Sequence, residues 1–257
     1  MPLRMAQAKI LWIDLQPTLH CLNKRVAQLL SQTAHVRRWS FQHDLDESCS
    51  IETIHQLLYE TLEASLEPVH LIGHGISGTI SGLFAEKYPD LVKSLTLLSV
   101  DTLSSNHWSS HYLQMRSQLP CARKSILIHL SSMLFPQISS RASQAFPSLL
   151  AKCLDSEFIQ GSILGHAPLD NLSASGVPTL VVNGSDDFVV DSNSENRWSQ
   201  ILKSGDRYLS VHHGRHFFQF DQASKTAQAI IDFIAMIPDN WLERDLNIND
   251  FTSLTQG

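Results

Sequence analysis

Short apolar runs alternate with amphipathic stretches along most of the chain, and this alternation predicts the class of fold. The apolar runs are typical of buried strands, whereas apolar residues spaced three or four positions apart are typical of helices. Strands separated by helices indicate an α/β protein with a mostly parallel sheet covered on both faces. The strands are predicted at residues 9–14, 36–41, 69–74, 94–100, 178–183 and 208–212, and the helices near residues 22–30, 51–62, 77–87, 193–203 and 227–237.

The pattern changes between residues 102 and 172, where no strand is predicted. An apolar stripe at helical spacing runs from Ile126 to Leu134. A segment of this length is too long for a structureless loop inside a compact domain. We therefore predict a helical lid at 102–172, inserted into a core formed by 1–101 and 173–238, and the pattern assigns no structure to the tail at 239–257.

Composition narrows the classes of function. The chain has 257 residues, of which 43% are apolar and 17% are charged, and its net charge is −6. Such a chain forms a globular core, and an acidic balance without a basic stripe argues against nucleic-acid binding. We find no apolar run long enough to span a membrane and no signal peptide, so we expect a cytoplasmic protein. The four cysteines are far apart in sequence and are expected to be reduced: Cys21, Cys49, Cys121 and Cys153.

Polar loops follow three of the predicted strands, around Gly75, Asp187 and His216. In parallel sheets, binding and catalytic sites lie outside the carboxyl ends of the strands. We therefore expect these three loops to converge, although they are far apart in sequence.

The residues in these loops resemble those of the α/β-hydrolase superfamily. Val69–Thr79 (VHLIGHGISGT) and Ala85–Leu98 (AEKYPDLVKSLTLL) resemble the nucleophile elbow and the strand after it. Pro178–Asp187 resembles the strand and loop that carry the catalytic acid, and Gly214–His216 resembles the catalytic-histidine loop. Their order also matches the superfamily. The chain also resembles cyanobacterial hydrolase-like proteins, and the resemblance to the superfamily implies an α/β-hydrolase fold and hydrolase ancestry.

The elbow departs from the G-x-S-x-G pattern at its centre. Aligned on the strand, Gly73 is the first small residue, Ser77 is the last, and the nucleophile position is Gly75. Glycine has no group that can form a covalent intermediate, but it adopts the sharp backbone turn without steric cost. The sequence therefore predicts a degenerate triad in which His216 and Asp187 remain while the nucleophile is lost.

Alternatives exist for each element of the site. Shifting the elbow by two residues would make Ser77 the nucleophile of a conventional serine esterase. Asp101, after the strand at 94–100, is a second candidate for the acid that orients the histidine. The oxyanion-hole donors are expected to be backbone N–H groups of Ile76 and of Leu15 or Gln16.

Three functions are consistent with these residues. The first is non-covalent chemistry by the His/Asp pair on a small apolar substrate such as an ester or ketone. The second is a non-catalytic role, either binding a small apolar ligand or interacting with a protein partner, and the third is conventional serine hydrolysis. We expect no metal, because His107 and His111 have no evident third ligand, and we expect no cofactor.

Overall fold

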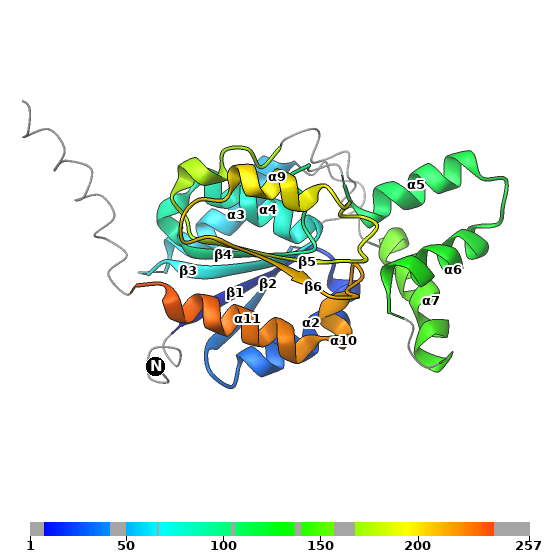
Figure 1. The fold of residues 1–257 in the computed structure, drawn as a ribbon, viewed down its shortest axis with the longest axis horizontal. Helices are drawn as coiled ribbons and strands as arrows, with labels where there is room; N and C mark the ends of the chain where they lie inside the picture. The colour runs from blue at the N-terminus through cyan, green and yellow to red at the C-terminus, as the bar shows by residue number, and fades with distance from the viewer. Residues whose placement is uncertain are drawn as a thin grey trace, which may run out of the picture.

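The computed structural model describes residues 8–41, 50–65, 67–103, 106–136, 140–156 and 168–238. The predicted tail at 239–257 lies outside the described residues. The described strands form one six-stranded sheet in the order β2-β1-β3-β4-β5-β6, and all neighbouring strands are parallel (Figure 1). The strands are β1 (Lys9–Asp14), β2 (His35–Ser40), β3 (Val69–His74), β4 (Val92–Leu98), β5 (Thr179–Gly184) and β6 (Arg207–Val211).

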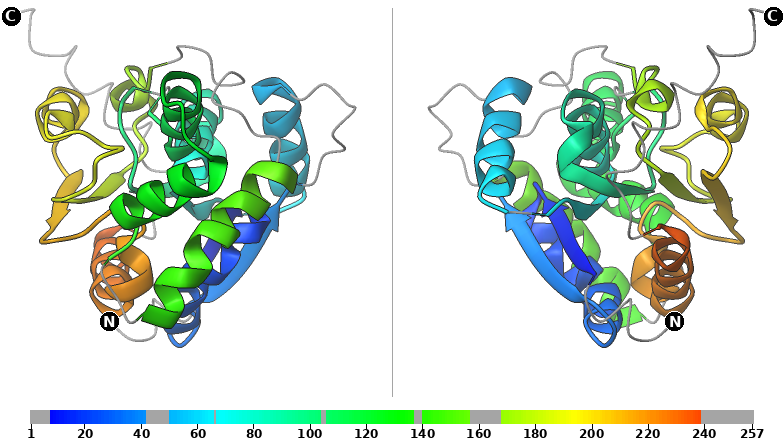
Figure 2. Two further views of the ribbon diagram at one scale, coloured as in Figure 1. Left: turned by 90° about the vertical axis from the view of Figure 1, so that its right-hand side faces the viewer. Right: turned by 90° about the vertical axis from the view of Figure 1, so that its left-hand side faces the viewer.

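Helices cover both faces of the sheet, as the alternating pattern predicts. One core cluster joins the sheet to α3, α4 and α9, and a second joins its other face to α2 and α11 (Figures 1 and 2). The central strand β3 is buried along its whole length, whereas β2 and β6 are mostly exposed edge strands. The core helices are α2 (His20–Leu30), α3 (Ile51–Glu63), α4 (Ile76–Lys87), α9 (Ser194–Ile201), α10 (Phe218–Asp221) and α11 (Ala223–Met236), with 3-10 turns η1 (Pro17–Leu19), η2 (Pro89–Leu91) and η3 (Leu172–Ser175).

The predicted strands and core helices are all present, with shifted ends. Among the strands, the largest difference is in β4, which runs from Val92 to Leu98 rather than from 94 to 100. Ser99 leaves the strand with a φ of 50°, a conformation that apolar patterning does not register. The chain therefore turns out of the sheet two residues before the apolar run ends.

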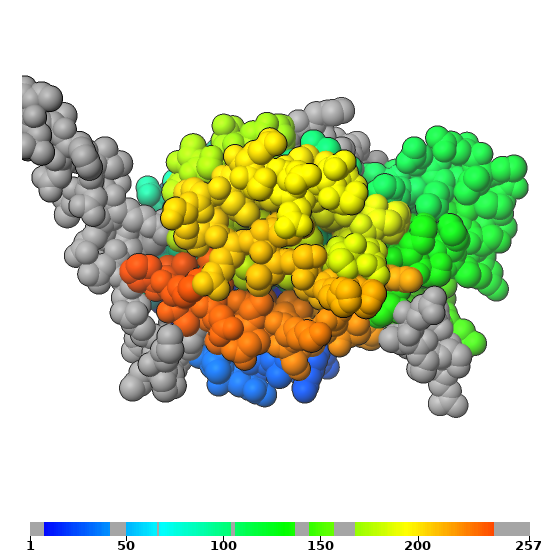
Figure 3. Space-filling view, viewed as in Figure 1, coloured from blue at the N-terminus to red at the C-terminus, as the bar shows by residue number. Residues whose placement is uncertain are grey.

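The segment between β4 and β5 contains helices but no strand among its described residues. The helices are α5 (Trp108–Gln118), α6 (Arg123–Leu134) and α7 (Ser140–Ser156), followed by η3. They extend to one side of the sheet in Figures 1 and 3. Their apolar side chains form a third cluster, which includes Phe217 beside the end of β6 and Leu22 in α2. The helical character predicted for 102–172 is therefore visible in the described part of that segment.

Three further expectations concern absences, and they are reported for the described residues alone. None of the described helices is both long and apolar enough to cross a membrane. No group of three or more His, Cys, Asp or Glu side chains in the described ranges is arranged to hold a metal ion. Cys21, Cys121 and Cys153 are not joined by a disulfide.

Candidate functional site

A sharp turn joins β3 to α4 and places Gly75 at the carboxyl edge of the sheet. Gly75 has φ 52° and ψ −124°, a combination that side-chain-bearing residues rarely adopt. The Gly75 N–H donates to the carbonyl of Leu98 at 2.9 Å, which holds the turn against the end of β4. The strand and helix also approach closely, because a Cβ at Gly73 would lie 2.6 Å from the backbone of Gly78. The glycines at this turn thus fit a tight strand-to-helix elbow.

His216 and Asp187 meet beside this turn. The His216 Nδ1 lies 3.0 Å from the Asp187 Oδ2, and the two side chains are 1% and 0% exposed. The other carboxylate oxygen accepts hydrogen bonds from the N–H groups of Val189 at 2.9 Å and Val190 at 3.3 Å. Burial alone would raise the pKa of the Asp187 carboxyl, but the adjacent His216 ring and these hydrogen bonds hold that pKa below its usual value. Asp187 is thus an ionised carboxylate that orients the imidazole.

Two glycines allow the loops that carry this pair to touch. A Cβ at Gly184, the last residue of β5, would overlap the carbonyl of Gly214 in the loop after β6. The Asp186 N–H donates to that same carbonyl at 2.9 Å. This backbone contact holds the loop after β5 against the loop after β6.

The second nitrogen of His216 faces the elbow. If a Cβ were present at Gly75, its nearest neighbour would be the His216 Nε2 at 3.6 Å, followed by the ring carbon Cε1 at 4.0 Å. Because a carboxylate accepts the proton on Nδ1, the uncharged ring carries a lone pair on Nε2. The Nε2 of His216 therefore lies beside the position that the first side-chain atom of a residue at 75 would occupy.

His74 and Ser99 hold the His216 backbone in place. Neither residue is predicted from the sequence pattern to belong to the site. The His74 Nε2–H donates to the His216 carbonyl at 2.8 Å, and the Ser99 hydroxyl donates to the same oxygen at 2.6 Å. Burial, with a smaller contribution from the charge of His216, lowers the pKa of His74 to about 3. His74 is therefore neutral, and its hydrogen bond positions the loop that carries His216. The signal available in the sequence was its place directly before Gly75.

Asp101, the alternative acid, occupies a different environment. Its carboxylate pairs with the Arg197 guanidinium at 2.5 Å and 3.0 Å and accepts from the Asn106 side chain at 2.9 Å. This bidentate ion pair ties the end of β4 to α9. The structure thus places Asp187 rather than Asp101 against His216.

Ser77, the alternative nucleophile, lies in the first turn of α4. Its hydroxyl oxygen accepts a hydrogen bond from the Leu15 N–H at 3.0 Å, and its side chain is buried between β1 and α4. The Leu15 N–H is therefore occupied and does not serve as an oxyanion donor. Ile76 begins α4, where the N–H groups of the first turn have no partner within the helix, and Gln16 is the remaining candidate in the loop after β1.

Aromatic rings form one wall of the site. His74 stacks on Phe217 with ring centroids 4.9 Å apart, Phe217 stacks on Phe135 at 4.7 Å, and Phe135 stacks on Phe146 at 3.8 Å. This series of rings runs from the elbow into α7 and contacts the helices of the segment 102–172. The His/Asp pair therefore adjoins a buried cluster of aromatic rings.

The sheet order, the elbow between β3 and α4, and the acid and histidine loops after β5 and β6 define an α/β-hydrolase fold. Solved structures with this fold align over most of the chain. The metagenomic α/β-hydrolase MGS-M2 from the Medee basin has a TM-score of 0.73 at 13% identity, covering 91% of this chain and 90% of that enzyme. A thermophilic esterase from Thermogutta terrifontis has a TM-score of 0.70 at 14% identity, covering 90% and 91% of the two chains.

Proteins with similar sequences include an uncharacterized protein and a lipase. An uncharacterized protein of Nostoc sp. is 29% identical over 87% of this chain and 89% of its own length. The rat monoacylglycerol lipase ABHD6 is 26% identical over 77% of this chain, although the match spans only 64% of the lipase. No family model matches the chain. These similarities show that the chain has an α/β-hydrolase fold.

Proposed function

We propose that this protein is an α/β-hydrolase-fold protein with a degenerate triad, in which His216 and Asp187 act as a general base without a covalent nucleophile. The observation that carries this proposal is the geometry around Gly75. The His216 Nε2 is 3.6 Å from the position of an absent Cβ, while its Nδ1 is held 3.0 Å from the Asp187 carboxylate. The ring is oriented by the carboxylate, and the proposed water or substrate atom would take the place of the side chain that residue 75 lacks.

The chemistry that follows is removal of one proton. The Nε2 lone pair accepts a proton from a bound water or from the carbon next to a substrate carbonyl, and Asp187 stabilises the imidazolium that forms. Negative charge then develops on the substrate oxygen. The Ile76 N–H at the start of α4 and the Gln16 N–H are the proposed donors to that oxygen.

The proposed substrate is a small apolar ester, ketone or related carbonyl compound. The aromatic wall formed by Phe217, Phe135 and Phe146 supports an apolar substrate. We further propose that the segment 102–172 acts as a lid over this site, since its helices pack against Phe217 beside His216. A lid that excludes water would strengthen the interaction of the His/Asp pair with the developing charge.

Serine hydrolysis through Ser77 is the conventional alternative. Two features favour Gly75 as the nucleophile position. The positive φ of an elbow is found at residue 75, and the Ser77 hydroxyl is engaged by Leu15. A nucleophile needs its base within hydrogen-bond reach, and the His216 Nε2 is directed at position 75.

Proton abstraction can be measured without knowing the natural substrate of the protein. We would incubate the protein with small ketones in deuterated water and follow exchange at the carbon next to the carbonyl by NMR. Wild type is expected to catalyse this exchange, and His216→Ala is expected to lose it. Exchange that is as fast in folded His216→Ala as in wild type would refute the proposal.

A serine-reactive phosphonate probe tests the elbow alignment separately. Wild type is expected to stay unlabelled, whereas Gly75→Ser is expected to be labelled only when His216 is present. Labelling of wild type that disappears in Ser77→Ala would establish the conventional mechanism instead. Absence of exchange together with stabilisation by an apolar ligand would identify a binding protein.

A further inference from the structure

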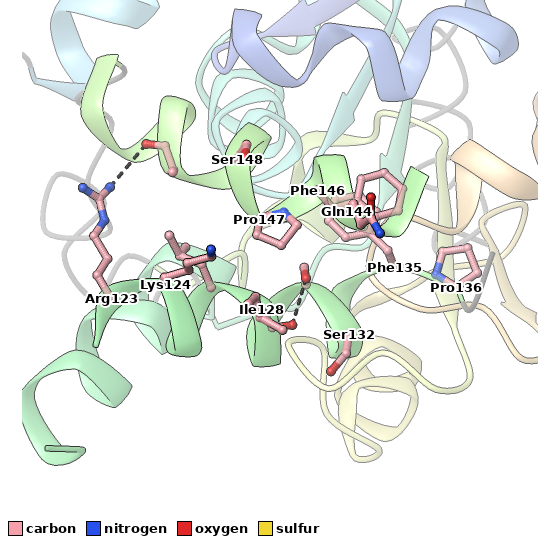
Figure 4. Close-up of a pocket in the computed structure, with 13 residues that line it drawn as sticks. Arg123, Lys124, Ile128, Ser132, Phe135, Pro136, Gln144, Phe146, Pro147 and Ser148 are labelled. Carbon is pink, nitrogen blue, oxygen red and sulfur yellow. Dashed lines mark hydrogen bonds between the residues drawn. The ribbon is translucent and has the colours of Figure 1, made fainter. Parts of the chain in front are cut away.

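A groove of about 1030 Å³ lies between α6 and α7, outside the His/Asp site (Figure 4). Its volume is at the upper limit of ordinary small-molecule pockets, which are about 300–1,000 Å³. The groove has two chemically different ends. Arg123 and Lys124 lie at one end in Figure 4, and Phe135, Phe146 and Pro136 lie at the other.

The walls between these ends are mostly apolar, with Gln144 and Ser148 of α7 as polar side chains. Leu127, Ile128 and Pro147 contribute hydrocarbon surface. The hydroxyls of two lining serines are already used within α6, since Ser131 donates to the Ile128 carbonyl at 2.9 Å and Ser132 donates to the His129 carbonyl at 2.6 Å. A molecule lying along the groove would therefore meet mainly carbon.

The two positive charges at the cationic end of the groove do not stabilise α6. Arg123 and Lys124 are the first two residues of α6, whose first turn has no acidic residue and no side-chain cap. Positive charge at a helix N-terminus is unfavourable, because the helix dipole already places partial positive charge there. Arg123 is partly compensated by Asp155, whose carboxylate is 2.6 Å away, whereas Lys124 forms no ion pair within the described part of the chain.

No acidic residue is present among the described residues that line the groove. Figure 4 shows the Lys124 side chain extending between the two helices, toward the side of the groove formed by Pro147. An anion at this end would interact favourably with Lys124 and with the N-terminus of α6. The positive charge at one end and the apolar lining along the groove therefore favour a ligand with a negatively charged head group and an apolar body.

We propose that this groove is a binding site for a long-chain carboxylate, with its carboxylate at Lys124 and its hydrocarbon chain lying along α6 toward Phe135. Lys124 and Phe135 are eleven residues apart, which corresponds to roughly 16 Å at a helical rise of 1.5 Å per residue. This distance suits an extended alkyl chain better than a compact metabolite.

The groove is separate from the proposed catalytic pocket. The stacked rings of Phe135 and Phe146 close its apolar end, and the other neighbour of Phe135 is Phe217, which adjoins His216. A ligand in the groove would contact the aromatic wall from the side away from the His/Asp pair. Binding in the groove therefore does not depend on the chemistry proposed for His216.

Calorimetric titration with monomeric dodecanoate tests the site. We expect one molecule to bind per chain, and we expect dodecylamine, which has the opposite charge, to bind at least tenfold more weakly. Octanoate is shorter by four methylenes and should bind roughly 250-fold more weakly, since each buried methylene contributes about fourfold.

Variants locate the ligand. Lys124→Glu is expected to weaken dodecanoate binding at least tenfold, Lys124→Arg should restore it, and Ile128→Asp should abolish it by placing a carboxylate in the groove. Ile128 is 49% exposed, so this change should leave the fold intact. Arg116→Glu makes the same change of charge on exposed α5 and is the matched control, with unchanged binding expected.

Three results would overturn the proposal: no dodecanoate binding by wild type, equal binding by Lys124→Glu, or equal affinity for dodecylamine. Loss of binding in His216→Ala alone would move the ligand to the catalytic pocket and would also contradict it. Binding to phosphatidylglycerol vesicles without binding of monomeric dodecanoate would replace the groove ligand by a membrane surface. Failure of the ketone-exchange assay would leave these outcomes unaffected.

Discussion

Gly75→Ser tests whether position 75 is an elbow that lacks only its side chain. The Cβ of the new serine would lie 3.6 Å from the His216 Nε2, an ordinary van der Waals distance. The substitution therefore meets no steric obstacle. Its cost comes from the backbone, because a residue with a side chain must adopt φ 52° and ψ −124°.

The expected change in stability combines three contributions. Backbone strain at such a position costs about 1–3 kcal/mol. Replacing a glycine also restricts the unfolded chain, which offsets about 0.4–1 kcal/mol of that cost. A hydrogen bond from the serine hydroxyl to the His216 Nε2 would contribute about 0.5–1.5 kcal/mol. We therefore expect Gly75→Ala to lose about 1–2 kcal/mol of unfolding free energy and Gly75→Ser to lose less, about 0–1 kcal/mol.

Urea unfolding of four variants separates these contributions. Gly75→Ala and Gly75→Ser share the strain and differ by the hydroxyl. Gly176→Ala and Gly176→Ser are the matched pair, because Gly176 also has a positive φ, 70°, but a Cβ there would have no neighbour within 4 Å. The serine variant should be more stable than the alanine variant at position 75 and not at position 176.

Two outcomes would refute this reasoning. A clear rise in stability for Gly75→Ala would show that the backbone at this position is unstrained. A difference between serine and alanine at position 75 that persists after His216→Ala would show that the hydroxyl interacts with another group. Either result would remove the argument for an emptied nucleophile position.

The remaining predictions concern the residues around this position. Asp187→Asn should slow ketone exchange by about 10²–10⁴-fold, because the imidazole loses its orienting carboxylate. NMR would measure the exchange rate, and circular dichroism should show little change in fold. An unchanged rate would show that Asp187 does not assist His216. His74 and His70 both have pKa values lowered to about 3, mainly by burial. Because the unfolded chain binds these protons near pH 6.5 and the folded chain does not, stability is present above pH 6.5 and is lost as the pH falls toward 3. Between pH 7 and pH 5.5 the loss should be about 1 kcal/mol for each of these histidines in urea unfolding, and His70→Asn should lower the pH dependence by the contribution of one histidine. Gly184→Ala should lose about 1–3 kcal/mol because its Cβ overlaps the Gly214 carbonyl, and a neutral effect in thermal unfolding would contradict that contact.

The fold was predictable because the signals that specify it are local. Buried parallel strands appear as apolar runs, and the helices between them carry apolar stripes at their own period. The exception is β4, where the apolar run continues through residue 100 but the strand ends at Leu98. The positive φ of Ser99 accounts for this difference, and apolar patterning contains no information about backbone sign.

The site was predictable to the level of loops and less so to the level of contacts. Positions relative to strand ends were sufficient to place Gly75, Asp187 and His216 near one another. They did not distinguish Asp187 from Asp101, because the distinction depends on Arg197, which is 96 residues from Asp101 in sequence. Long-range side-chain contacts of this kind leave no local pattern.

The presence of a buried His/Asp pair beside a glycine elbow is itself informative. A buried carboxylate hydrogen-bonded to an imidazole is seldom more stable than apolar residues of similar volume, because both polar groups lose their hydration. Stability therefore does not explain why Asp187 and His216 occupy positions that are almost fully buried. Four hydrogen bonds hold this pair in place. The Val189 and Val190 N–H groups donate to the Asp187 carboxylate, and the His74 and Ser99 side chains donate to the His216 carbonyl. An arrangement that orients an imidazole so fully, yet leaves its Nε2 without a side chain opposite it, is explained if the partner of that nitrogen is a water or a substrate.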